Sequence, residues 1–142
     1  MKHLSLYVIG VVLFLTSCEL HRSTDGLDGF WQLCTVDTLA TGGTTDMRES
    51  QQTWCVQGSI LEVRDMKMGQ DFIFSFNHTI GHLTLFAPYI SKREEGDIPI
   101  TDPAIMNPWG IYHLEEHFDI LENSSTRLVL RSDRLQLTFR SY

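Results

Sequence analysis

The chain has 142 residues, of which 42% are hydrophobic, and its formal net charge is −7. This length fits one domain, which can bury a core of its own without a metal or several disulfides. The acidic excess argues against nucleic acid as a partner, because that binding depends on neutralising phosphates. It also argues against attachment to anionic lipid through a polybasic patch.

Residues 1–17 have the features of a secretory signal peptide. Lys2 and His3 give a basic start, and an apolar run follows over residues 4–15. The run is too short for a membrane-spanning helix, which needs ~20 apolar residues. It leads into Leu-Thr-Ser-Cys18, which resembles the lipobox of bacterial lipoproteins, whose cysteine is acylated and becomes the new N-terminus. We therefore expect lipidation of Cys18 and a mature chain of 125 residues.

Residues 18–28 are polar and lack periodicity, which predicts a tether between the lipid and a folded domain over residues 29–142. In that domain, apolar and polar residues alternate over short runs separated by polar turns, as in antiparallel strands. A succession of such strands predicts an all-β fold, a single antiparallel up-and-down barrel of about eight strands. The large side chains expected to point inward are Trp31, Trp54, Phe72, Phe74, Phe76, Phe118 and Phe139.

So many rings on the inner face raise the question of whether the barrel is hollow. One interpretation is a cavity for a hydrophobic ligand. The other is a filled core, because an eight-stranded barrel is just wide enough for its own side chains to fill. We favour a largely filled interior.

Two stretches interrupt the alternation: residues 37–52 and the segment Pro88–Pro108, which contains all four prolines of the chain. Loops of this length are uncommon and often functional, and binding residues usually lie on loops held by a rigid scaffold. We expect the proline-rich segment to bind a ligand or partner, and the alternative is a plug in the barrel mouth. The residues concerned are Tyr89, Ile98, Ile100, Ile105, Met106 and Trp109.

Cys34 and Cys55 are the two cysteines that remain beside Cys18. An even number in an exported chain is compatible with a disulfide, and the alternative is two buried thiols. Each follows an expected inward-facing residue, so both lie on one face of the sheet if the first two strands pair. We therefore predict that they lie close enough to be bonded, which requires Cα atoms within ~7 Å.

The segment His113–His117 matches His-x-x-Glu-His, a zinc-peptidase pattern in which a helix presents both histidines to one ion. Only a strand pair is expected after it, and such an enzyme needs a larger fold and a third ligand. We therefore expect no catalytic residue and no metal there. His78 and His82 flank an expected turn without a carboxylate or thiol partner, so we expect no metal there either. No nucleophile elbow or phosphate loop occurs, and no cofactor is expected.

The tripeptide Gly29-Phe30-Trp31 opens the first expected strand, and Gly-x-Trp at this place resembles the lipocalin signature. Together with the lipobox and the C-terminal strands, it resembles the small lipocalin-like lipoproteins of Gram-negative bacteria, many of them domains of unknown function. The resemblance covers Leu27–Tyr142. It implies an eight-stranded barrel with Trp31 at its closed end and Arg140 packed against that ring.

The leading hypothesis is a lipid-anchored binding or interaction module of the cell envelope, for a small hydrophobic ligand or an envelope protein. The lipid on Cys18 would provide the membrane attachment, and the absence of Asp at Glu19 is compatible with delivery to the outer membrane. One alternative is an accessory subunit of an outer-membrane assembly without a ligand of its own. Another is a small zinc-dependent envelope enzyme that uses the histidine-rich region.

Overall fold

The computed structural model describes residues 26–92 and 94–142, so the expected signal peptide, Cys18 and most of the tether lie outside the described residues. The strands of this part are β1 (Gly29–Thr38), β2 (Thr44–Asp46), β3 (Gln52–Gln57), β4 (Ile60–Asp65), β5 (Gln70–Thr79), β6 (His82–Lys92), β7 (Gly96–Pro99), β8 (Glu116–Asn123), β9 (Arg127–Arg131) and β10 (Leu135–Ser141). Two short 3-10 helices, η1 (Arg48–Ser50) and η2 (Pro103–Trp109), accompany them. No helix within these ranges is long and apolar enough to span a membrane.

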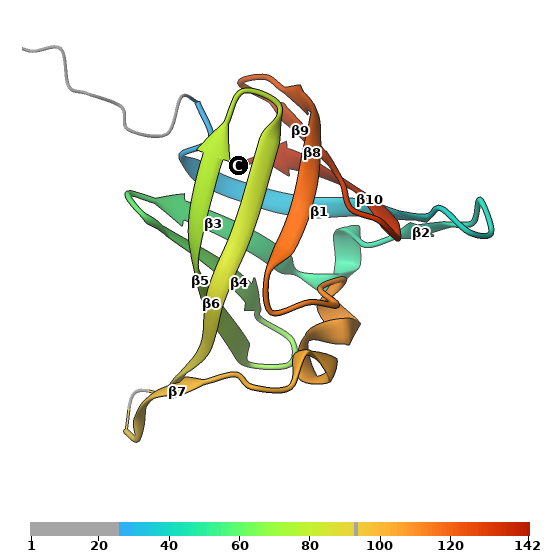
Figure 1. The fold of residues 1–142 in the computed structure, drawn as a ribbon. Helices are drawn as coiled ribbons and strands as arrows, with labels where there is room; N and C mark the ends of the chain where they lie inside the picture. The colour runs from blue at the N-terminus through green and yellow to red at the C-terminus, as the bar shows by residue number, and fades with distance from the viewer. Residues whose placement is uncertain (1–25, 93) are drawn as a thin grey trace, which may run out of the picture.

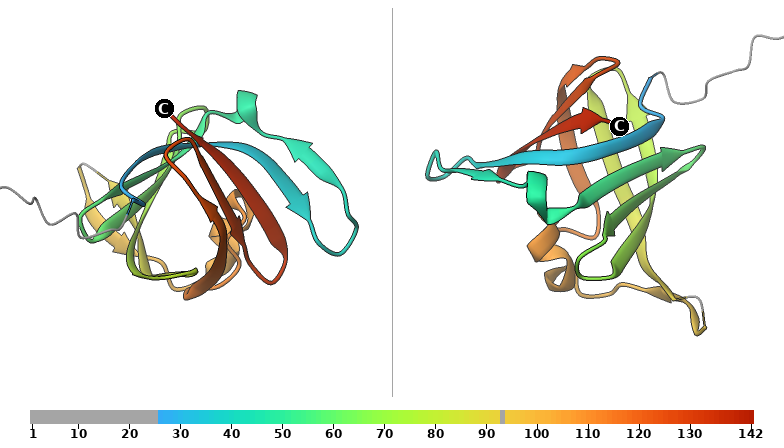
Figure 2. Two further views of the ribbon diagram at one scale, coloured as in Figure 1. Left: turned by 90° about the horizontal axis from the view of Figure 1, so that it is seen from above. Right: turned by 180° about the vertical axis from the view of Figure 1, so that it is seen from behind.

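Eight of the strands form a closed ring of antiparallel pairs, in the order β1-β3-β4-β5-β6-β8-β9-β10 and back to β1. Short connections join most neighbours in the ring, as an up-and-down barrel requires, and β2 and β7 pair only with β1 and β6. Figure 1 shows β7 projecting below the ring at the end of β6, and Figure 2 shows the strands wrapping around one interior. The predicted all-β antiparallel barrel is confirmed.

Aromatic side chains from opposite walls meet in the interior. The Trp54 ring of β3 lies 5.7 Å from that of Phe118 and 4.9 Å from that of Phe139, centroid to centroid. Six of the seven large residues expected to point inward are buried, and Phe76 is partly buried against the same cluster. The predicted filled core is therefore what these residues form.

Trp31 is buried near the start of β1, at the beginning of the domain. Its side chain is buried, and its indole Nε1 donates to the carbonyl oxygen of Leu27 at 2.8 Å. Gly29 has φ +132°, a conformation that side-chain-bearing residues rarely adopt, so the glycine of Gly-x-Trp is needed where the chain enters β1. The prediction of a buried Trp31 is confirmed.

Arg140 does not pack against Trp31, as the resemblance had implied. In β10, Arg140 follows the buried Phe139, so its side chain projects from the outer face of the barrel and is exposed. Its Nε donates instead to Oε1 of Gln32 at 2.6 Å, across the β1–β10 pair.

The other end of the barrel is closed by η2, which was not predicted (Figure 1). Pro103 stands at its start and Asp102 accepts a hydrogen bond from the Ala104 backbone N–H, both of which favour a helix start. Met106 is fully buried among the core residues. The expected loop Pro88–Pro108 is therefore wrong in part, since it holds the second half of β6, all of β7 and most of η2.

Trp109, the last residue of η2, fixes this cap to the barrel wall. Its ring meets Phe72 edge-on at 4.9 Å, and its indole N–H donates to Oδ2 of Asp65 at 3.0 Å. Asp65 is itself buried, and its other oxygen accepts from the backbone N–H groups of Lys67 and Met68. A buried carboxylate with this many donors is satisfied, so it anchors the cap at little cost.

The predicted disulfide is wrong, since Cys34 and Cys55 are free thiols in the described structure. β1 does pair with β3, but Cys55 lies opposite Phe30, four residues before Cys34. At the rise of a strand this offset separates the two cysteines by ~13 Å, well beyond disulfide reach. The prediction that both cysteines lie on one face of the sheet is correct, but the register that it assumed between β1 and β3 is wrong.

Candidate functional site

β6 leaves the barrel wall at a β-bulge. Ser75 of β5 lies opposite Phe86, and Ile73 lies opposite Tyr89, so Ala87 and Pro88 together face a single residue of β5. Ala87 has φ +49°, which is uncommon for a residue with a Cβ. Proline is tolerated at a bulge because no ladder hydrogen bond is required of it there. The bulge therefore bends β6 at a defined point.

The bend changes the partner of β6. Up to Leu85, β6 pairs with β8, and from Tyr89 onward it pairs with β7. The backbone N–H of Ile100 donates to the carbonyl of Pro88 at 3.0 Å and ties the end of β7 to the bulge. Between the departing β6 and the loop before β8, a flank of the barrel is left without a strand.

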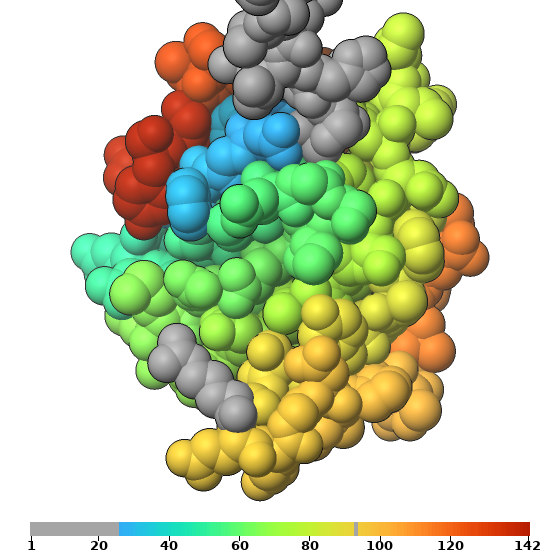
Figure 3. Space-filling view, turned by 90° about the vertical axis from the view of Figure 1, so that its left-hand side faces the viewer, coloured from blue at the N-terminus to red at the C-terminus, as the bar shows by residue number. Residues whose placement is uncertain are grey.

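An apolar groove of about 320 Å³ lies on this flank. Tyr89 and Ile100, both expected binding residues, line it together with Leu114 from the loop before β8. The remaining lining residues are Ala87, Pro88 and Pro99. Figure 3 shows the end of β6 and β7, in yellow to gold, forming the lower part of one face of the molecule.

The other expected binding residues divide between surface and cap. Ile98 and Ile105 keep 38% and 46% of their surface exposed. Met106 is fully buried and Trp109 packs on Phe72, so these two belong to the cap. Leu114 and Ala87 line the groove but were not predicted as binding residues, because both lie outside the segment Pro88–Pro108. The positive φ of Ala87 cannot be recognised from the sequence.

A second groove, of about 780 Å³ and more polar in character, lies further along the same flank. It is lined by His82, Thr84, His113, Glu115, Glu116, His117, Phe118, Asp119, Arg131, Ser132 and Asp133. The ionisable side chains of this groove lie between the first residues of β8 and the β9–β10 turn.

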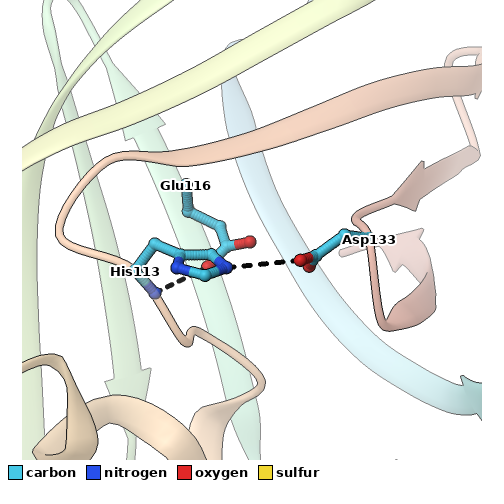
Figure 4. A group of neighbouring side chains, drawn as sticks. All are labelled: His113, Glu116 and Asp133. Atoms are coloured by element: carbon cyan, nitrogen blue, oxygen red, sulfur yellow. Dashed lines mark hydrogen bonds and ion pairs between the residues drawn. The ribbon is translucent and has the colours of Figure 1, made fainter.

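The zinc-peptidase arrangement expected of His-x-x-Glu-His does not form. His113 lies in a loop, while Glu116 and His117 are successive residues of β8 and project to opposite faces. His117 Nδ1 lies 3.1 Å from the hydroxyl of Thr84. His113 instead pairs with Asp133, with 3.3 Å between its Nε2 and Oδ2 of the carboxylate (Figure 4).

His78 and His82 are not brought together either. In the β5–β6 hairpin His82 lies opposite Thr79, and His78 lies opposite Leu83. His82 Nδ1 contacts Oδ1 of Asp119 at 3.2 Å, with both side chains well exposed. This pair is an exposed surface contact, which typically contributes ~0–1 kcal/mol.

Comparison with known families decides what kind of barrel this is. Residues 13–142 match the family described as the lipocalin-like domain. The chain belongs to this family. No curated protein matches the chain.

Two crystal structures share the lipocalin-like fold. A lipocalin-like protein from Bacteroides uniformis matches with a TM-score of 0.62 and 17% identity, over 82% of this chain and 99% of that one. An uncharacterized protein from Bacteroides eggerthii matches with a TM-score of 0.61 and 15% identity, over 81% and 98%. At this level of identity they establish the barrel and leave its ligand open.

Proposed function

We propose that this lipocalin-like domain is a lipid-anchored binding module of the cell envelope that takes a small hydrophobic ligand in the apolar groove beside the β6 bulge. The observation that carries the proposal is that groove, lined by Tyr89, Ile100, Leu114 and their neighbours. The lipocalin-like family supports a binding role for the barrel, and the proposal involves no catalytic step.

The interior is not the proposed binding site, because the rings of Trp54, Phe118 and Phe139 already meet there. The groove has the size of a small-ligand site, since such sites begin at ~300 Å³ and are mostly apolar with few polar groups. Tyr89 is the one lining residue with a polar side-chain group, and the others are aliphatic. This chemistry favours an apolar ligand with few hydrogen-bonding groups.

Backbone strain at the groove is consistent with a binding role. The positive φ of Ala87 stands beside Pro88, at the bulge that opens the flank. Such conformations persist where the surroundings enforce them, and they cluster at ligand sites. Bulges likewise re-aim strands next to binding sites.

The groove is tested with the neutral dye N-phenyl-1-naphthylamine and the full-length protein in detergent. After subtraction of the signal from protein-free micelles, we expect saturable enhancement of dye fluorescence that Leu114→Ser weakens, because Leu114 lines the groove and is already 38% exposed. Leu121→Ser is the matched control, since Leu121 is an exposed leucine of β8 outside the groove lining. Equal dye binding by both variants would show that the dye does not occupy this groove.

Membrane attachment through Cys18 is part of the same proposal and has its own test. The Leu-Thr-Ser-Cys18 pattern supports acylation, and residues 18–28 would tether the domain to the outer membrane. We expect the protein to incorporate labelled palmitate in a membrane fraction, and Cys18→Ala to remove the label while the barrel still folds. An unmodified wild-type protein in the soluble fraction would contradict the anchor.

The exposed side chains of Ile98 and Ile105 favour a second candidate function, an accessory subunit that contacts a partner protein. In an outer-membrane assembly, a partner protein would cover these two side chains. The dye would then be excluded from the groove in the assembled protein and not in the free protein. Cross-linking from position 98 in intact cells distinguishes the two, because a ligand carrier gives no reproducible protein adduct there.

A further inference from the structure

Three potential metal ligands converge at the β8 end of the polar groove. His113 comes from the loop before β8, Glu116 is the first residue of β8, and Asp133 lies in the turn between β9 and β10. One ligand atom from each lies within 4.8 Å of the other two. Figure 4 shows the imidazole of His113 beside the Glu116 carboxylate and joined to Asp133 by a dashed line, so segments twenty residues apart meet at one point.

Glu116 is a buried carboxylate whose two oxygens differ in their hydrogen-bond partners. Its residue is 1% exposed, and its Oε2 accepts from the backbone N–H groups of Tyr112 at 2.8 Å and His113 at 3.0 Å. Among the described residues, no protein donor is within hydrogen-bonding distance of its Oε1. That oxygen points toward the carboxylate of Asp133 (Figure 4). A buried carboxylate oxygen without a donor is a group that a bound cation can satisfy.

We propose that His113, Glu116 and Asp133 bind a divalent transition-metal ion, with Zn²⁺ as the best match to the donor set. One imidazole nitrogen and two carboxylate oxygens are donors that Zn²⁺ accepts, whereas Mg²⁺ and Ca²⁺ prefer oxygen alone. Three protein ligands leave a coordination position open, as in zinc sites that hold an exchangeable water. All three residues line the polar groove, so a small anion in the groove could reach a bound ion.

The nearby arginines are engaged elsewhere. Arg131 Nη2 donates to Oε1 of Gln136 at 2.9 Å, and the Arg134 guanidinium lies 4.5 Å from the centre of the Tyr112 ring. Among the described residues, no arginine or lysine forms an ion pair with Glu116 or Asp133, and the imidazole of His113 is the side chain in contact with the Asp133 carboxylate. A bound cation would therefore supply a positive charge beside these two carboxylates.

The test is a calorimetric titration of Zn²⁺ into the full-length protein in detergent, after removal of bound metal with EDTA. We expect one equivalent of Zn²⁺ to bind, since the three ligands form one site. His113→Ala and Asp133→Asn should each weaken binding by about tenfold or more. Asp133 is exposed, so Asp133→Asn leaves the fold intact, which a thermal melt in EDTA verifies.

His82→Ala is the matched control, because His82 and Asp119 form an exposed histidine–aspartate contact in the same groove. Zinc affinity unchanged by His82→Ala but lowered by the two site variants supports the proposal. The proposal fails if no saturable stoichiometric binding occurs, or if His82→Ala removes it, or if both site variants bind as wild type does. None of these outcomes bears on dye binding in the apolar groove, so the proposed function is tested separately.

Discussion

The inner face of the barrel and the flank between β6 and β8 use the same strands in different ways. Inside, side chains of successive strands alternate in register and fill the space, as the rings around Trp54 show. On the flank, β6 is bent at Ala87 and Pro88, and both the apolar groove and the His113 cluster lie where regular pairing with β8 is absent or just beginning. In this barrel the core is filled by packed side chains, and the interruptions leave the two grooves open at the surface.

The largest effect that would sharpen this comparison is at Trp31, which belongs wholly to the inner face. We expect Trp31→Ala to reduce the free energy of unfolding by ~3–5 kcal/mol, the range for deleting a large core aromatic. Trp31→Phe keeps a ring but leaves the Leu27 carbonyl without its donor, and should cost ~1–3 kcal/mol. Chemical denaturation measures both. A stable Trp31→Ala variant would mean that this end of the barrel contributes little to the fold.

Met106 tests whether η2 belongs to the core or to the flank. The side chain is fully buried, so Met106→Ala should cost ~2–5 kcal/mol. Its neighbour Ile105 is 46% exposed, and Ile105→Ala should change stability by no more than ~0.5 kcal/mol. Thermal melts of the two variants compare adjacent residues of one helix. Equal and small effects would mean that η2 is a detachable loop.

Much of the inner face could be predicted from sequence because period-two alternation states directly which side chains point inward. The cap could not, since the seven residues of η2 contain Pro103 and Pro108 and are too short for a hydrophobic period. The two free cysteines show a different limit. Alternation identified their shared outer face, but it does not give the register of β1 against β3, which places Cys55 opposite Phe30.

The flank was predicted only in part, for a related physical reason. Tyr89 and Ile100 were predicted as binding residues because they are apolar residues of a proline-rich segment without strand periodicity, and both line the groove. Leu114 lines the groove beside the bend of β6 at Ala87 and Pro88. Pro88 marks an interruption of the strand in the sequence, but not the direction of the bend or the loop that it approaches. Asp133 lies twenty residues after His113, and no local spacing connects them. Contacts made by topology alone are invisible to motif analysis.

Ile98 and Ile100 lie in the segment that follows the bulge, where Ile98 is exposed and Ile100 is buried. Substituting each of them tests the exposed and the buried side of this segment. Ile100 is nearly buried and lines the apolar groove, so Ile100→Ser should cost ~1–3 kcal/mol and weaken dye binding. Ile98 is 38% exposed, and Ile98→Ser should leave the melting temperature within about a degree or two, an effect of ~0.5 kcal/mol or less. Differential scanning calorimetry separates the two. If both substitutions unfold the domain, the whole segment is structural.

The smallest expected effect concerns Cys55, on the outer face of the barrel and away from the flank. Burial, and secondarily the negative charge of Glu62, raises the pKa of its thiol above the ordinary value. The thiolate is the reactive form, so at pH 8 Cys55 should react with iodoacetamide more slowly than cysteine in an unfolded peptide. Because the folded-state pKa is the higher one, this group stabilises the fold below its ordinary pKa and loses that contribution as the pH rises through the folded value.

Glu62→Gln should speed the reaction slightly by removing the repulsion between the carboxylate and the developing thiolate. Mass spectrometry of native protein after timed alkylation reports the rate at Cys55, and Cys34 labelling in the same sample shows whether the two thiols are both free. Resistance of both to alkylation until a reductant is added would restore the disulfide and require a different β1–β3 register.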